Sequence, residues 1–161
     1  MERRLPNSDW CYVCGENNPL GHHVVFTTDG ERVRTRYKPE VHRQGYPGVV
    51  HGGVLCTILD ETMGWSASLK SDRLYVTGEL TVRFLRPMPA GTAMIIEGHA
   101  GSVTKRLAHV TGEVRDENGV VYATAAGKYL PLSAEKTKEV DDRLNYRPDT
   151  VSLFGREKQE E

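Results

Sequence analysis

The chain has 161 residues, of which 27% are charged and 38% hydrophobic, and its formal net charge is −1. This composition excludes a disordered or collagen-like chain, and the near-neutral charge argues against a general nucleic-acid-binding protein, which is usually basic. No apolar run approaches the roughly 18 residues of a membrane span, and the opening residues lack the apolar core of a secretory signal. Three cysteines do not indicate a disulfide scaffold, and a reducing cytoplasm is expected. Length, charge and hydropathy together predict one domain without membrane or nucleic-acid partners.

The N-terminal segment, residues 1–22, is rich in turn-forming residues and contains Cys11 and Cys14 in a C-x-x-C motif. His22 and His23 follow, but a zinc site takes four ligands and the sequence has no second C-x-x-C. A redox role has less support because no βαβ pattern surrounds the motif. We therefore expect buried thiols beside a tight turn, with no metal and no cofactor, and keep a structural zinc site as the alternative.

Two runs with strand character, 22–28 and 31–39, come next, and the Asp29-Gly30 pair between them predicts a β-hairpin. A glycine-rich loop at 42–50 then leads into a stretch from Gly53 to about Leu69. This stretch favours a helix of roughly four to five turns.

The second half of the chain alternates apolar and polar residues in the manner of strands. Four such runs occupy residues 75–87, 92–101, 105–116 and 120–132, and Asn118-Gly119 predicts a turn between the last two. One helix with an antiparallel sheet makes the fold class α+β. The charge-dense tail, 133–161, holds few apolar residues, and we expect it to lie over the domain or to fray.

The predicted helix begins at a glycine pair, Gly52 and Gly53, directly after His51. The first N–H groups of a helix have no partner inside it, and the macrodipole adds positive potential there. Because glycine has no side chain, another group can approach this backbone closely. The pattern suits a carbonyl oxygen that gains negative charge during a reaction, although a lone Gly-Gly also serves as a flexible joint.

Two adjacent carboxylates, Asp60 and Glu61, lie in the middle of the same helix. Asp60 shares a helical face with mostly small residues: Cys56, Thr57, Met63, Gly64 and Ala67. A carboxylate on such a face either pairs with a buried cation or takes part in chemistry. Glu61 is one step round the helix, a position more typical of a surface or salt-bridge residue.

Gly52 and Asp60 are eight residues apart, which is about 12 Å along a helix axis. The aspartate side chain leans towards the N-terminus but cannot cover that distance. If both groups act on one carbonyl, the acid must come from a second subunit. The spacing therefore predicts at least a dimer with its site at the interface.

The motifs GYPGVVHGGVLCTILDE, at 45–61, and TGELTVRFLRPMPAG, at 77–91, resemble those of hotdog-fold acyl-CoA thioesterases of the PaaI-like group. The resemblance covers roughly residues 20–132. It implies a hotdog domain at 23–132, in which an antiparallel sheet wraps around one long central helix. It also implies that the sheets of two subunits join, that dimers often pair into tetramers, and that acyl-CoA is the small-molecule partner.

The resemblance also implies roles for individual residues. The N–H of Gly52, next to His51, would polarise the thioester carbonyl, and Asp60 would act as general base on water or as nucleophile through an anhydride. Thr77 falls where some members carry a serine that helps to place the water. Candidates for contact with the acyl-CoA are Gly53, Gln44, Gly64 and Glu61, and the basic residues Arg83, Lys105 and Arg106 are candidates for its phosphates.

Two positions depart from the pattern of some relatives. Gly45 stands where they carry an Asn or Gln that helps to hold the water or carbonyl, which leaves the neighbouring Gln44 as a weak substitute. Gly64 replaces a Ser or Thr and leaves room for a bulkier acyl group. A non-catalytic acyl-CoA-binding module is the alternative to a thioesterase, and a hydratase would require a different His–Asp arrangement.

Overall fold

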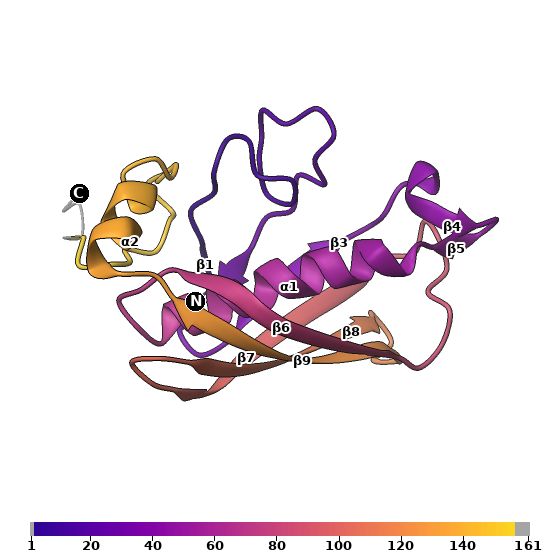
Figure 1. The fold of residues 1–161 in the computed structure, drawn as a ribbon. Coiled ribbons are helices and arrows are strands. Elements are labelled where there is room, and N and C mark those ends of the chain that lie inside the picture. The colour runs from indigo at the N-terminus through magenta and orange to yellow at the C-terminus, as the bar shows by residue number, and fades with distance from the viewer. Residues whose placement is uncertain (1, 157–161) are drawn as a thin grey trace.

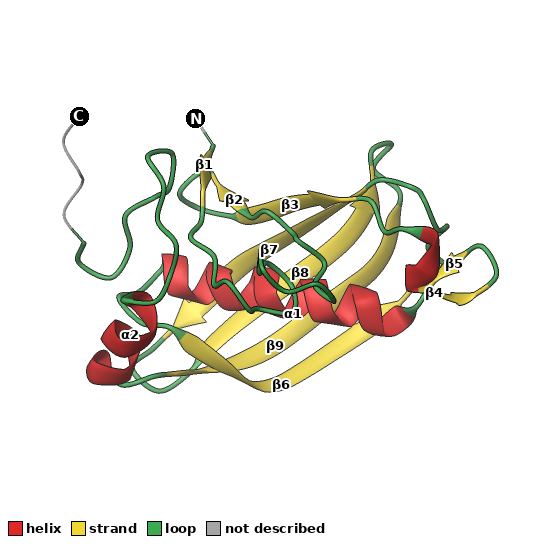
Figure 2. Cartoon of the chain, turned by 90° about the horizontal axis from the view of Figure 1, so that it is seen from above, coloured by secondary structure: helices red, strands yellow, loops and turns green. Residues whose placement is uncertain are grey.

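A long helix, α1 (Gly52–Leu69), lies across one face of a curved antiparallel sheet (Figures 1 and 2). The computed structural model describes residues 2–156. The sheet contains seven strands in the spatial order β1 (Arg3–Arg4), β2 (Thr27–Thr28), β3 (Val33–Tyr37), β7 (Met94–Val103), β8 (Ala108–Asp116), β9 (Val121–Pro131) and β6 (Tyr75–Phe84). This arrangement confirms the predicted α+β class with one long helix against an antiparallel sheet.

Smaller elements flank the two ends of α1 (Figure 1). The glycine-rich loop forms a short 3₁₀ turn, η1 (Val41–Arg43), and a two-stranded sheet of β4 (Gln44–Tyr46) and β5 (Val49–Val50) beside the N-terminus of α1. A second helix, α2 (Ala134–Asp141), lies towards the other end. Among the described residues, no helix combines the length and the apolar composition needed to cross a bilayer.

The core forms where α1 meets the sheet. Leu55, Ile58, Leu59 and Met63 of α1 are almost fully buried. The sheet carries glycine where the helix comes closest: a Cβ at Gly112 of β8 would lie 2.9 Å from the Met63 sulfur. Because this packing buries Met63, only part of the small-residue face remains open, and that part includes Asp60.

The predicted hairpin and the four later strands are present. Gly30 has a φ of +99°, and the Asp29 carboxylate accepts hydrogen bonds from the N–H groups of Glu31 and Arg32, which closes the turn between β2 and β3. Gly119 turns β8 into β9 with a φ of +82°. β2 is much shorter than the run that predicted it.

Strand β6 forms one edge of the sheet, because it pairs only with β9 among the described strands. It is ten residues long, and Val76 and Phe84 on it are about half exposed. A long free edge with exposed apolar side chains can accept a further strand.

The N-terminal segment and the C-terminal tail pack together. β1 extends the main sheet, which the sequence did not predict, and the Val151 N–H donates to the Arg4 carbonyl. Val151 and Leu153 are buried, so the described part of the tail lies over the domain. The remainder of the predicted tail, 157–161, lies outside the described residues.

Candidate active site

Asp60 lies half-buried in the middle of α1 and accepts two hydrogen bonds on one carboxylate oxygen. The Thr77 hydroxyl donates to Asp60 Oδ1 at 2.7 Å, and the Tyr129 hydroxyl donates to the same atom at 3.1 Å. Thr77 and Tyr129 are register partners on β6 and β9, so both hydroxyls lie side by side next to Asp60. No described residue donates to the other oxygen, Oδ2, which leaves it available to a substrate or water.

Tyr129 is a site residue that the sequence analysis missed. It is 1% exposed, and burial together with the charge of Asp60 holds the pKa of its hydroxyl well above the usual range. The hydroxyl therefore stays protonated and acts as a donor. The alternation of β9 could have revealed it, because Tyr129 falls on the same face as the buried Ala123 and Ala125 and its hydroxyl needs a polar partner there.

A pocket of about 350 Å³ adjoins the acid. Asp60, Gly64 and Trp65 of α1 form part of its wall, and Leu74 and Leu144 add apolar surface. A Cβ at Gly64 would lie 3.7 Å from the Tyr129 ring, an ordinary contact, so packing within this chain does not require glycine at that position.

A second pocket, of about 530 Å³, lies at the N-terminus of α1 and is lined by His51, Gly52, Phe84 and Arg86, among others. The Gly52 N–H has no acceptor among the described residues, whereas the Gly53 N–H donates to Nδ1 of His51 at 2.9 Å. His51 thus caps the helix and leaves the Gly52 N–H as the free donor. No residue lines both pockets, so the structure places Gly52 and Asp60 in separate cavities.

The loop before α1 explains why position 45 carries glycine where some relatives carry Asn or Gln. A Cβ at Gly45 would lie 3.0 Å from the His51 ring, so the imidazole occupies the space that a side chain would need. The neighbouring Gln44 is exposed and does not line either pocket. Its side-chain oxygen accepts a hydrogen bond from the Gly48 N–H and holds the loop.

Glu61 does not occupy the surface or salt-bridge position that its place on the helix suggested. It is half-buried and lines the same pocket as Asp60, and no described basic residue forms an ion pair with it. Its Oε1 accepts from the Trp65 indole N–H at 3.4 Å, and its Oε2 lies 3.0 Å from the Cys11 sulfur. Burial raises the pKa of Glu61 to about 8. The cause is the N-terminal segment, which folds over this face of α1.

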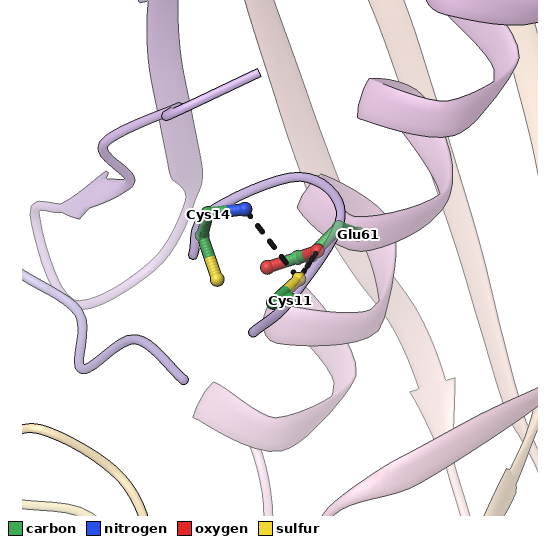
Figure 3. Close-up of side chains that lie close together, drawn as sticks. All are labelled: Cys11, Cys14 and Glu61. Carbon is green, nitrogen blue, oxygen red and sulfur yellow. Dashed lines mark hydrogen bonds between the residues drawn. The ribbon is translucent and has the colours of Figure 1, made fainter. Parts of the chain in front are cut away.

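The same segment brings three groups together that could hold a metal (Figure 3). The sulfurs of Cys11 and Cys14 and a carboxylate oxygen of Glu61 all lie within 4.8 Å of one another. Interaction with the Cys14 side chain, together with hydrogen bonds from backbone N–H groups, lowers the pKa of Cys11 to about 5. The same interaction and burial hold the pKa of Cys14 above its usual range. Neither His22 nor His23 belongs to this group.

The basic residues that are candidates for contact with the CoA phosphates do not line either pocket. Arg83, Lys105 and Arg106 are exposed and line neither cavity. Lys105 and Arg106 lie in the turn between β7 and β8, where the Thr104 hydroxyl accepts from both the Arg106 and Leu107 N–H groups. Strand register places this turn at the same end of the sheet as Tyr129.

Residues 47–123 match the family model described as the thioesterase superfamily. The chain is 36% identical to a protein of Saccharolobus solfataricus over 101 residues, which are 62% of this chain and 70% of that relative. It is 25% identical to the acyl-coenzyme A thioesterase THEM4 of Bos taurus over 84% of this chain and 56% of the relative. The chain spans about half the length of the curated relatives that it matches first.

The fold is also similar to that of solved proteins. A crystal structure of a thioesterase superfamily protein superimposes with a TM-score of 0.70 and 30% sequence identity, covering 76% of this chain and 60% of the other. Sequence and fold therefore agree: this chain belongs to the thioesterase superfamily and has the hotdog fold.

Proposed function

We propose that this protein hydrolyses the thioester bond of an acyl-CoA, releasing a carboxylic acid and free CoA. One observation carries the proposal: among the described residues, the Gly52 N–H of α1 has no acceptor and one carboxylate oxygen of Asp60 has no donor. These are the donor and the acid/base group that acyl transfer to water needs. Membership of the superfamily and the name of the THEM4 relative support the same reaction class.

The Gly52 N–H would donate to the thioester carbonyl oxygen, where negative charge develops as a nucleophile adds to the carbonyl carbon. The positive end of the helix dipole stabilises the same charge. Asp60 would either take a proton from the attacking water or attack the carbon itself, giving an anhydride that water then hydrolyses. In both routes the carbon–sulfur bond breaks and the CoA sulfur leaves and is protonated. Thr77 and Tyr129 would hold Oδ1, so that Oδ2 reacts.

We infer that each site is built from two chains. Gly52 and Asp60 line separate pockets and are about 12 Å apart along the helix axis. The free edge of β6 supports a dimer, because two β6 strands that pair about a two-fold axis run antiparallel. Such pairing brings the start of β6, where Thr77 contacts Asp60, towards the end of the partner's β6.

That end of β6 carries Phe84, and a Cβ at Gly52 would lie 3.2 Å from the Phe84 ring. Pairing of the β6 edges would therefore bring the Gly52 pocket of one chain to the Asp60 pocket of the other. The assembly we propose is this dimer or a pair of such dimers, in the cytoplasm, where the cysteine content fits a reducing environment.

We place the acyl group in the pocket beside Asp60, where Trp65, Leu74 and Leu144 offer apolar surface. Arg83, Lys105 and Arg106 are exposed and form no ion pair with described residues, which leaves them free to meet the phosphates of CoA.

A free-thiol assay with short-chain, long-chain and aryl acyl-CoA substrates tests the proposal. We expect thiol release with at least one class, and the preferred class would define the acyl pocket. Tight binding of an acyl-CoA without thiol release would overturn hydrolysis and identify a binding module instead.

A further inference from the structure

The turn at Cys11 and Cys14 has a backbone arranged around a sulfur. The N–H groups of Val13 and Cys14 both donate to the Cys11 sulfur, at 3.3 and 3.4 Å. Such bonds favour the thiolate, which is the form that binds metals.

Gly15 completes the turn. Its N–H donates to the Cys11 carbonyl at 3.0 Å, and a Cβ at Gly15 would lie 2.4 Å from that oxygen. No other residue could follow Cys14 without moving the backbone. The turn therefore requires glycine at this position, and it holds the two sulfurs within 4.8 Å of each other.

Glu61 projects from α1 and places its carboxylate beside this turn (Figure 3). Its Oε2 lies 3.0 Å from the Cys11 sulfur, and the three ligand atoms lie within 4.8 Å of one another. Cys14 is 4% exposed, and among residues 2–156 no lysine or arginine forms an ion pair with Glu61. Three groups that are anionic when they bind a metal thus converge at a partly buried place, where no described basic residue pairs with Glu61.

We propose that Cys11, Cys14 and Glu61 bind one Zn²⁺ ion, which ties the N-terminal segment to α1. Two thiolates and a carboxylate suit zinc and disfavour Mg²⁺ or Ca²⁺, which take oxygen ligands. Binding forms two Zn–S bonds and one Zn–O bond to the protein in place of water ligands of the free ion, and any proton on these groups goes to solvent. Because Cys11 and Glu61 also line the pocket beside Asp60, the ion would form part of its wall, with the fourth position taken by water.

The sequence made this ligand set look incomplete, because the histidines after the motif were the expected partners. The structure gives His22 a different role: its ring packs edge-on between Tyr12 and Tyr37, and Nδ1 lies 2.9 Å from the Tyr37 hydroxyl. Glu61, far along the chain, provides the third ligand instead. The zinc proposal does not depend on the proposed hydrolysis.

The test uses untagged, reduced full-length protein that is stripped with a chelator and then titrated with Zn²⁺, and separately with Co²⁺ as a spectroscopic probe. We expect one zinc per chain and a sulfur-to-cobalt charge-transfer band. Loss of a group that merely orients a ligand weakens metal binding about 10–100-fold, so Cys11→Ser and Cys14→Ser should weaken it by roughly 100-fold or more. Glu61→Gln should weaken binding while the charge-transfer band persists.

Cys56→Ser is the matched control, since Cys56 is the third free cysteine, lies on α1 and does not belong to the group. It should bind zinc like the wild type. Zinc should also raise the melting temperature of the wild type and of Cys56→Ser, but not that of Cys14→Ser, and circular dichroism of the stripped variants checks that they fold. Substoichiometric zinc in the wild type, or stoichiometric zinc that survives in Cys11→Ser and Cys14→Ser, would overturn the proposal.

Discussion

The Thr77 hydroxyl donates a 2.7 Å hydrogen bond to Oδ1 of Asp60, across the gap between the edge strand β6 and the central helix. Tyr129 donates to the same oxygen from the neighbouring strand. Two donors on one oxygen orient the carboxylate and leave its other oxygen without a donor among the described residues. The acid is thereby positioned by the sheet rather than by its own helix.

Replacing Asp60 by Asn tests the role of the acid. Asn keeps an oxygen that can accept from Thr77 and Tyr129, so the fold and its melting temperature should be preserved. Thiol release should fall by roughly two to four orders of magnitude, as expected for loss of a general base. The measurement is kcat in the free-thiol assay, and wild-type turnover in a folded Asp60→Asn protein would rule out this mechanism.

Tyr129→Phe removes one donor to Asp60 while keeping the ring in the core. A hydrogen bond to a charged group contributes about 1.5–3 kcal/mol, so kcat should fall by roughly 10–100-fold with little change in KM. Tyr122→Phe is the control, because Tyr122 is also on β9 and its hydroxyl donates to a different aspartate, Asp116. Its kcat should match the wild type. A Tyr129→Phe protein that loses melting temperature but not kcat would show that the hydroxyl is only structural.

Local patterns predicted most of the architecture. The helix at 53–69 and the four later strands follow from periodicity and turn residues, which act over a few positions, and the structure confirms both. β1 was missed because Arg3 and Arg4 become a strand only by pairing with β2.

The site was predicted less completely because its contacts join distant parts of the chain. The burial of Glu61 depends on residues 11–14, which cover it from the other end of the sequence. The role of Tyr129 depends on its register with Thr77, and the loop contact of Gln44 depends on how β4 and β5 fold. None of these contacts produces a recognisable pattern among neighbouring residues in the sequence.

Stability should decrease in mild acid because of His22. Its side chain is 7% exposed, its Nε2 has no partner among the described residues, and burial together with the charge of Arg43 lowers its pKa to about 4. The unfolded chain binds this proton near pH 6.5, whereas the folded protein binds it only near pH 4. The free energy of unfolding should therefore fall between these values, by up to about 3 kcal/mol from this group.

Urea unfolding of the wild type and of His22→Gln at pH 7, 6, 5 and 4 measures this contribution. Carboxylates titrate in both proteins, so the difference in slope between them isolates His22. We expect a shallower loss in His22→Gln below pH 6.5, and parallel curves would contradict the assignment.

The proposed two-chain site makes its own prediction about the donor. Gly52 is the first residue of α1, a position that tolerates proline, so Gly52→Pro removes the N–H with little harm to the helix. Gly52→Ala adds the same Cβ against Phe84 but keeps the N–H. Gly52→Pro should therefore lower kcat far more than Gly52→Ala, and equal losses would trace the effect to crowding at Phe84.

Mixing Gly52→Pro with Asp60→Asn then decides whether donor and acid come from different chains. If they do, a mixed dimer has one site with both defects and one site with neither. Random pairing makes half of the dimers mixed, and each of these has one intact site of two, so an equal mixture should recover about a quarter of wild-type activity. Thiol release is measured after the two variants are refolded together, and a mass measurement verifies that mixed dimers have formed. If donor and acid instead come from one chain, every site in the mixture carries a defect, and activity stays at the level of the separate variants.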